Sequence, residues 1–275
     1  MRKHRSGVLV EARYLGVILG AVPSNDGILL VDVPLKPDDG RDWMGQLTNT
    51  GRPKYIALMD QHPDRALGMR AFDLPILAQE ATLQAIRGWP DAFKGSAKPI
   101  GAEADALKRI TGVHKAIPSI SFEHELKLHL GEREVLFWHR PGPTAGSMWV
   151  VLPEAKIAFI GDTVTVSEPP YIGDAEIEAW IESLDELRSG AFSSFLLISG
   201  RDGSVDREAL NAMARFVRKI PVRLQRMKKK GDSPEVAQSV AKGLLKDYAV
   251  LNARGDLVLL RLQAGLRKLH IRSMG

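Results

Sequence analysis

Two kinds of strand pattern occupy different parts of this 275-residue chain, and their coexistence restricts its fold more than any other feature. In the first third, apolar runs such as 27–34 and 55–59 alternate with stretches of helical spacing. Between 120 and 164, two stretches alternate apolar and polar residues around a short turn, which is typical of β-hairpins. Two mixed sheets packed on each other, with helices outside, would bury all of these apolar faces.

Several segments are expected to be helical after the hairpins. Asp174 can cap a helix over the next residues, and Ser233-Pro234-Glu235 is a strong helix start. The stretch 256–272 mixes apolar residues with arginine and is compatible with either a helix or a strand. We expect residues 1–230 to form the main domain, with 231–275 as a basic, mainly helical extension packed on it. That extension would cap a pocket or make a homodimer contact.

Basic residues concentrate in the C-terminal part of the chain. The net charge is +5, yet from Arg201 onward 17 Lys and Arg stand against 7 Asp and Glu. The excess peaks between Arg215 and Lys230. A weak contact with nucleic acid or another polyanion is one interpretation. A solvated helix face is the favoured one, because no aromatic residues are interleaved with the charges.

Composition excludes several classes of protein. With 44% hydrophobic residues the chain can build a substantial core, and without cysteine it has neither disulfides nor thiolate metal ligands. No apolar run is long enough to span a bilayer, and no signal-peptide core follows the basic N-terminus. We therefore expect a cytoplasmic protein without membrane contact.

The loop after the apolar run 55–59 carries metal-ligand side chains at alternate positions: Asp60, His62 and Asp64, with Arg65 next to them. Alternate positions of an extended chain project to the same side, so these groups should converge. The stretch is either a metal site or the remnant of one.

Four landmarks place this loop in a larger pattern. They are Asp60-x-His62-x-Asp64-Arg65, the segment 141–147 (Pro-Gly-Pro-Thr-Ala-Gly-Ser), Gly161-Asp162 and Gly200-Arg201. Their order and spacing, from about Gly16 to Gly203, resemble the metallo-β-lactamase superfamily. The resemblance implies a hydrolase-like protein of the α/β (α+β) class, a four-layer αββα sandwich of two mixed sheets with outer helices.

The resemblance also implies a set of metal ligands, and this chain departs from it. One metal of the family is held by three histidines, whose places here are taken by Asp60, His62 and Pro143. The second is held at the places of Asp64, Arg65 and Arg201, and Asp162 matches the aspartate that bridges both metals. Proline has no ligand atom, and arginine has no acceptor lone pair. Four of the seven positions have therefore changed.

Two interpretations follow. In the first, the chain is a degenerate, non-hydrolytic member and a pseudoenzyme without metal. Its pocket, formed by Arg65, Arg201, Pro143 and Thr144, would bind a small anionic ligand or serve as a structural core.

In the second, the chain is a single-metal hydrolase of an ester, lactone, thioester or phosphodiester. Asp60, His62 and Asp162 would hold Mn, Fe, Mg or Zn, and Asp64 would be the general base. A simpler role for His62 is a hydrogen bond to Asp162 or Asp64, and Asp32 is expected to order a loop.

Overall fold

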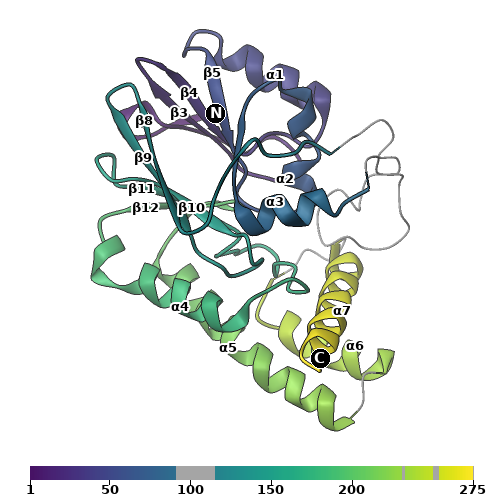
Figure 1. Ribbon diagram of the computed structural model, residues 1–275. Helices are drawn as coiled ribbons and strands as arrows, with labels where there is room; N and C mark the ends of the chain where they lie inside the picture. Colours follow the sequence, from purple (N-terminus) through teal and green to yellow (C-terminus); the bar gives the residue numbers. More distant parts are fainter. Residues whose placement is uncertain (91–114, 231–232, 250–253, 275) are drawn as a thin grey trace.

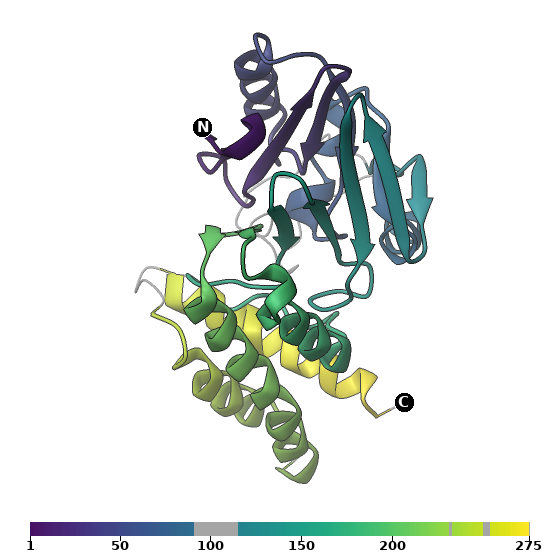
Figure 2. The same ribbon diagram turned by 90° about the vertical axis from the view of Figure 1, so that its left-hand side faces the viewer.

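The computed structural model describes residues 1–90, 115–230, 233–249 and 254–274. Two mixed sheets pack face to face, and helices cover their outer faces (Figures 1 and 2). The predicted four-layer sandwich is thereby confirmed.

The first sheet contains seven strands in the order of the chain: β1 (Arg2–Lys3), β2 (Leu9–Glu11), β3 (Leu19–Ser24), β4 (Gly27–Val31), β5 (Pro53–Ala57), β6 (Ile76–Gln79) and β7 (Ile120–Phe122). Strands β1 to β4 are antiparallel neighbours, whereas β4 to β7 run parallel. The segment 12–18, which contains Gly16 at a φ of +100°, separates β2 from β3.

The second sheet follows the order β13 (Gly203–Val205), β12 (Leu196–Ser199), β11 (Ile157–Gly161), β10 (Met148–Leu152), β9 (Arg133–His139) and β8 (Glu125–Leu130). The two hairpins predicted from alternation are confirmed as β8–β9 and β10–β11. Strands β11 and β12 are parallel. Each sheet therefore contains a parallel pair, β4–β5 in one and β11–β12 in the other.

Among the described residues, the helices beside the first sheet are α1 (Pro37–Leu47), α2 (Pro63–Ala66) and α3 (Glu80–Arg87). Those beside the second sheet are α4 (Ile177–Arg188), α5 (Arg207–Lys230), α6 (Pro234–Leu245) and α7 (Gly255–Arg272). Short 3-10 turns lie at Arg5–Gly7, Met69–Ala71 and Gly190–Phe192. The stretch left open between helix and strand is α7.

Of the two helix starts predicted from the sequence, one is confirmed and the other is wrong. Ser233 caps α6 as expected, with its Oγ accepting from Val236 N at 3.4 Å. Asp174 does not cap α4, because the preceding loop continues to Glu176. Helix α2 ends at Ala66, and the 3-10 turn at Met69–Ala71 follows it. A Cβ on Gly68 would collide with the carbonyl oxygen of Pro34, so the chain passes here too close to its neighbour for any other residue.

Three hydrophobic clusters fill the spaces between the four layers. One lies between the sheets, with Val31, Phe137 and Phe159 among its members. A second packs α1 and α3 on the first sheet around the fully buried Trp43. The third joins β10 and β11 to residues of α4, α5, α6 and α7, so the last two helices share a core with the second sheet. None of the helices in the described ranges combines the length and apolar character needed to cross a bilayer.

Candidate functional site

The side chains singled out in the sequence gather where the parallel strands end. Asp32 directly follows β4 and Asp60 lies three residues after β5, while Asp162 directly follows β11 and Arg201 lies two residues after β12. Because the strands of each pair are parallel, their carboxyl ends meet at one edge, and the two edges face each other. Groups from both sheets therefore come together at the end of the sandwich.

Arg65, on α2, connects the two sheets. Its side chain has no solvent exposure. Nη1 donates to Asp32, Nη2 donates to Asp162, and Nε lies 3.2 Å from Asp60 Oδ1. A Cβ on Gly200 would collide with Nη2, so glycine at this position makes room for the guanidinium group. Arg65 thus binds two carboxylates of the first sheet and one of the second.

Arg201 forms the outer half of the same network and is 21% exposed. It grips Asp162 with two parallel contacts, Nε to Oδ1 at 2.9 Å and Nη2 to Oδ2 at 2.7 Å. Its Nη1 also donates to Asp64 and, at 2.6 Å, to the carbonyl oxygen of Gly16. Both oxygens of Asp162 are therefore engaged by guanidinium groups, and bidentate pairs of this kind are the stronger ones.

His62 lies beside these carboxylates and is 3% exposed. Its Nδ1 is 2.9 Å from Asp60 Oδ1 and 3.5 Å from Asp162 Oδ2, and its ring meets Tyr171 edge-on with centroids 6.5 Å apart. The buried Nε2 has no hydrogen-bond partner among the described residues. The simpler role considered for His62 named Asp162 or Asp64 as partner, whereas the closest one is Asp60.

The charges of the network shift its pKa values in consistent directions. Burial alone would raise the pKa of Asp162, but Arg201, Arg65 and His62 hold it well below its usual range. Burial alone would lower the pKa of His62, but Asp60 and Asp162 raise it, which favours the protonated ring. Burial raises the pKa of Asp32 to about 6, although Arg65 opposes the shift. The network places four carboxylates against two guanidinium groups and one imidazole, so most of its charges have an opposite partner.

The residues present fit a pair of metal ions poorly. Two metals would need lone pairs at positions where Arg65 and Arg201 supply only donors, and both guanidinium groups already bind Asp162. One ion has a better donor set. Asp60, His62 and Asp162 each offer a ligand atom, and these atoms lie within 4.8 Å of one another. To bind it, Asp162 would have to release guanidinium contacts.

Pro143 and Thr144, also expected in the pocket, are buried in the loop between β9 and β10. Thr144 bonds within this loop, with its backbone N 3.1 Å from the Ser147 Oγ. No hydrogen bond links either residue to Arg65, Arg201 or Asp162 in the described part of the chain.

A cavity of about 470 Å³ opens beside Asp162 and Arg201. Its other walls are the segments 12–18 and 165–171 together with Arg254, which directly precedes α7, and Arg261, in the second turn of α7. Sequence reasoning missed these two arginines. Their partner Glu168 lies 86 positions before Arg254, and no local pattern signals such a pairing.

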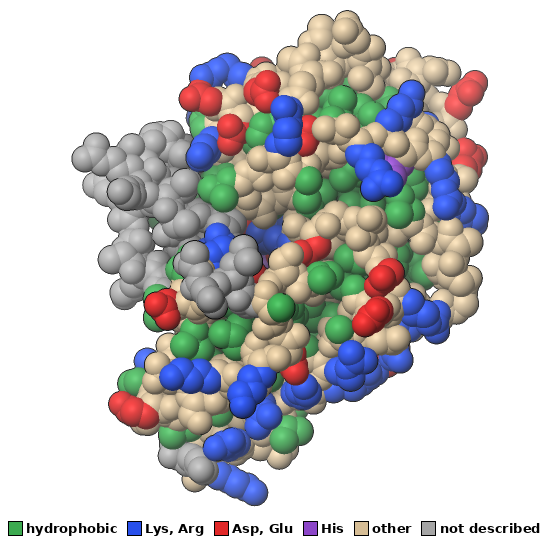
Figure 3. Space-filling model, turned by 180° about the vertical axis from the view of Figure 1, so that it is seen from behind, with side chains coloured by type: hydrophobic (Ala, Val, Ile, Leu, Met, Phe, Trp, Pro, Cys, Tyr) green, Lys and Arg blue, Asp and Glu red, His purple; other side chains and the backbone are tan. Residues whose placement is uncertain are grey.

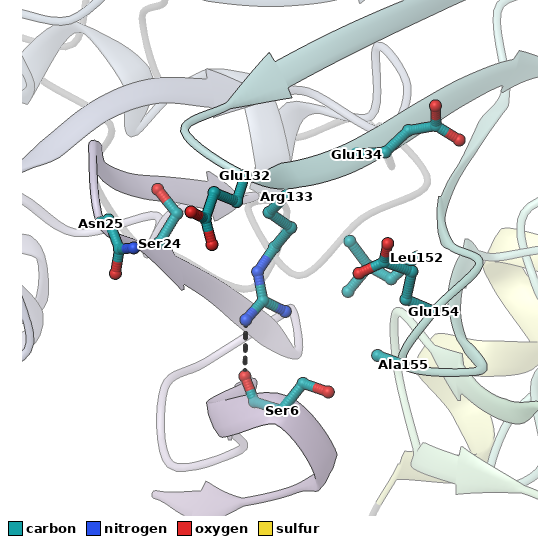
Figure 4. Close-up of a pocket in the computed structure, with 9 residues that line it drawn as sticks. All are labelled: Ser6, Ser24, Asn25, Glu132, Arg133, Glu134, Leu152, Glu154 and Ala155. Carbon is teal, nitrogen blue, oxygen red and sulfur yellow. Dashed lines mark hydrogen bonds between the residues drawn. The ribbon is translucent and has the colours of Figure 1, made fainter.

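A smaller hollow of about 200 Å³ lies near the turns of β3–β4 and β8–β9. Figure 4 shows Arg133 between Glu132 and Glu154, with a hydrogen bond of 2.8 Å from Arg133 to the carbonyl oxygen of Ser6. This hollow shares no residue with the arginine–aspartate network, which consists of Arg65 and Arg201 with their partners Asp32, Asp60, Asp64 and Asp162.

The basic side chains of α5 are partly engaged within the molecule. Arg218 lies 2.7 Å from Asp185, and Lys219 lies 2.7 Å from Asp247. Figure 3 shows Lys and Arg side chains gathered near the lower end of the molecule, the part built by the C-terminal helices in Figure 1. The polyanion contact between Arg215 and Lys230 stays a prediction.

Comparison with known proteins agrees with this architecture. The family model described as Metallo-beta-lactamase superfamily matches residues 62–191. No curated protein matches the sequence. Among solved structures, the DIM-1 metallo-beta-lactamase is similar with a TM-score of 0.62 and 18% identity, covering 79% of this chain and 96% of its own. A metallo-beta-lactamase from Pontibacter korlensis gives a TM-score of 0.58 and 16% identity, covering 77% of this chain and 99% of its own.

A third neighbour extends the likeness to the C-terminal helices. The inverting sec-alkylsulfatase Pisa1 from Pseudomonas sp. is similar with a TM-score of 0.64 and 14% identity, covering 94% of this chain. This chain spans about half of that enzyme's length, 48%. At identities this low, the likeness to these structures shows the fold alone. The family model adds a match at the level of sequence. The chain therefore has the metallo-β-lactamase fold, and its residues 62–191 match the model of that superfamily.

Proposed function

We propose that this protein is a non-hydrolytic member of its superfamily. In this proposal Arg65 and Arg201 take the structural place of the metal ions, and the adjoining cavity binds a small anionic ligand. Arg65 is enclosed by carboxylates, so a ligand would meet the network through Arg201, which lines the cavity.

One observation carries the proposal: Asp162 directs both of its oxygens to guanidinium groups. By the superfamily resemblance, this is the carboxylate that would bridge two metals. Here Arg201 holds it with two contacts and Arg65 with a third. The bonding capacity that would bind a metal pair is already used by groups that belong to the chain.

Electrostatics favours the same conclusion. A divalent ion about 5 Å from one guanidinium would be repelled by roughly 7 kcal/mol at an effective dielectric constant of 20. Carboxylates can offset such repulsion only if they are available to the ion. Asp32, Asp64 and Asp162 all have an arginine partner. A metal would therefore compete with arginine for nearly every carboxylate in the network.

Elemental analysis of the purified, untagged protein tests the proposal. The protein is measured as isolated and after incubation with Zn, Mn and Fe, beside a His62→Ala variant. The proposal expects less than a tenth of an equivalent of metal in both proteins. About one equivalent in the wild type, lost in the variant, would overturn it.

A second candidate function, single-metal hydrolysis, rests on a specific observation. The ligand atoms of Asp60, His62 and Asp162 lie within 4.8 Å of one another, and His62 Nε2 has no partner among the residues described. These three residues would hold the ion, which when bound would activate water as a Lewis acid. Asp64, the expected base, is buried and bonded to Arg201, and it would have to leave that contact before accepting a proton.

Activity assays separate the two candidates. Ester, lactone, thioester and phosphodiester substrates are offered with and without added Mn or Zn. The hydrolase requires turnover that depends on the metal and is abolished by His62→Ala. Absence of turnover on all four classes, together with absence of bound metal, leaves the ligand-binding proposal.

A further inference from the structure

Arg201 lines the cavity of about 470 Å³, yet its N–H groups are already directed to acceptors of the chain itself. A guanidinium group has five N–H donors, all in its own plane. Here Nε and Nη2 bind Asp162, and Nη1 and Nη2 bind Asp64. The second N–H of Nη1 donates to the carbonyl oxygen of Gly16 at 2.6 Å. The 21% of this side chain that is exposed can therefore offer a ligand only its flat face or its methylene stem.

Arg140 shows how the face of such a group is used elsewhere in this chain. Its Nε and Nη2 bind the two carboxylate oxygens of Glu186 at 2.6 and 2.8 Å, and its Nη1 donates to a backbone carbonyl oxygen. The guanidinium carbon lies 5.1 Å from the ring centre of Trp138 and 5.5 Å from that of Trp149. A guanidinium group fixed by hydrogen bonds in its plane is thus free to stack on aromatic rings, a favourable cation–π contact.

Arg201 has the same arrangement in its plane but lacks the rings. Asp162 binds its Nε and Nη2, as Glu186 binds those of Arg140, and a backbone oxygen again accepts from Nη1. Within the described ranges, no aromatic side chain lies over the guanidinium group of Arg201. Because Arg201 lines the cavity while its N–H groups point into the protein, the cavity adjoins the place where a ring would stack.

Apolar side chains account for much of the remaining wall of the cavity. They are Leu15, Val17, Ile18, Pro169, Pro170 and Tyr171. A volume of about 470 Å³ is within the range that encloses a small organic molecule. The walls therefore suit an apolar ligand body, and the face of Arg201 favours a body that is flat.

From these features we infer that the cavity binds a planar aromatic compound, whose ring stacks on the face of Arg201 as the two indole rings stack on Arg140. The ring is recognised by its π surface and not by hydrogen bonds from the guanidinium group. The inference rests on the proposed ligand-binding function. It adds the class of ligand and the part of that ligand which Arg201 contacts.

Isothermal titration of the full chain with a matched pair of probes tests this assignment. The probes are naphthalene-2-methanol and its saturated analogue, decahydronaphthalene-2-methanol. The saturated alcohol is the more apolar of the two, so a cavity that merely excludes water would bind it more tightly. Stacking on Arg201 should reverse this order, with the aromatic alcohol binding at least about threefold more tightly.

Variants locate the contact. Arg201→Lys keeps the positive charge but removes the planar face, so it should abolish the preference for the aromatic alcohol while the saturated alcohol still binds. A misfolded variant would lose both, and the comparison in the wild type would then decide. Leu15→Ser changes a wall residue that is 36% exposed and should weaken binding of both alcohols. Leu260→Ser is the matched control, because Leu260 is 48% exposed and does not line the cavity.

The outcomes separate this inference from the proposed function. Equal or tighter binding of the saturated alcohol by the wild type, absence of binding by both alcohols, or a preference that persists in a folded Arg201→Lys would overturn the inference. The proposed anionic ligand is tested separately with 2-naphthoate, which adds a negative charge to the same ring. Naphthoate binding no tighter than that of naphthalene-2-methanol would refute the anionic ligand while the ring preference stands. Tighter naphthoate binding without a ring preference would refute the stacking alone.

Discussion

Replacing Arg65 by methionine gives the most direct test of the arginine–aspartate network. The substitution keeps the volume similar but removes the cation that joins Asp32, Asp60 and Asp162. Asp162 keeps Arg201, and Asp60 keeps His62, whereas within the described ranges Asp32 retains only the hydrogen bond from Met59 N at 3.1 Å. At least one fully buried carboxylate thus loses its charged partner.

The loss of stability in Arg65→Met can be estimated from this one stranded carboxylate. Removing one partner of a buried ion pair typically costs about 3–5 kcal/mol. This is a large fraction of the roughly 5–15 kcal/mol by which proteins are stable. At about 2–4 °C per kcal/mol, the melting temperature should fall by roughly 6–20 °C. Adding Asp32→Asn to Arg65→Met should restore part of the loss, because the stranded carboxylate is then neutral.

Equilibrium urea denaturation measures the loss, with Arg41→Met as the control. Arg41 pairs with Asp38 on the surface of α1, where its side chain is 75% exposed, so this variant should lose almost no stability. A chelator should leave the stability of the wild type unchanged. If Arg65→Met lost no more stability than Arg41→Met, or if the chelator destabilised the wild type strongly, the idea that arginine joins the sheets would be refuted.

Three further predictions address the same site. Gly200→Ala should destabilise the protein, because the added Cβ would collide with Arg65 Nη2. Gly190→Ala is the control, because open space surrounds Gly190. Similar urea denaturation midpoints for the two variants would contradict the packing argument. Because burial raises the pKa of Asp32 to about 6, from about 4 in the unfolded chain, the wild type takes up a proton on folding between these values. The free energy of unfolding of the wild type, relative to that of Asp32→Asn, should therefore fall from pH 4 to 6 and level off above pH 6. Urea titrations of both proteins at several pH values measure this difference, and a difference that does not change with pH would contradict the prediction. Arg201→His removes a cation and adds a ligand atom, so elemental analysis after incubation with Zn should find more retained metal than in the wild type.

The sequence could indicate which side chains of one loop converge, because that part of the pattern is local. Asp60, His62 and Asp64 follow one strand, and alternation along an extended chain is enough to bring the first two into contact. Their partners depend on the sheets. Asp64 faces Arg201, 137 positions away, rather than the carboxylate and imidazole beside it in the sequence. Alternation indicates which side a residue faces and gives no information about which distant strand approaches that side.

The C-terminal part was less predictable for a related reason. Leucines and valines follow one another at the start of α7, so neither helical nor strand periodicity stands out. The segment is a helix packed closely on the 172–173 segment: a Cβ on Gly265 would meet Ile172 Cγ1 at 2.9 Å and Gly173 N at 3.2 Å. The same contact fixes the position of α7 beside the cavity, and with it the placement of Arg254 and Arg261.

The network separates two tasks that a metal pair performs together in the superfamily, as the resemblance implies. A metal pair both connects ligands from the two sheets and activates water as a Lewis acid. Guanidinium groups can carry out the first task, since Arg65 joins Asp32 and Asp162 across the sheets and Arg201 joins Asp64 to Asp162. They offer no vacant orbital to a water molecule and, being always protonated, do not accept its proton. Under the proposed function, arginine at these two positions would keep the connection between the sheets without the Lewis-acid chemistry, and the fold would persist with a site suited to binding.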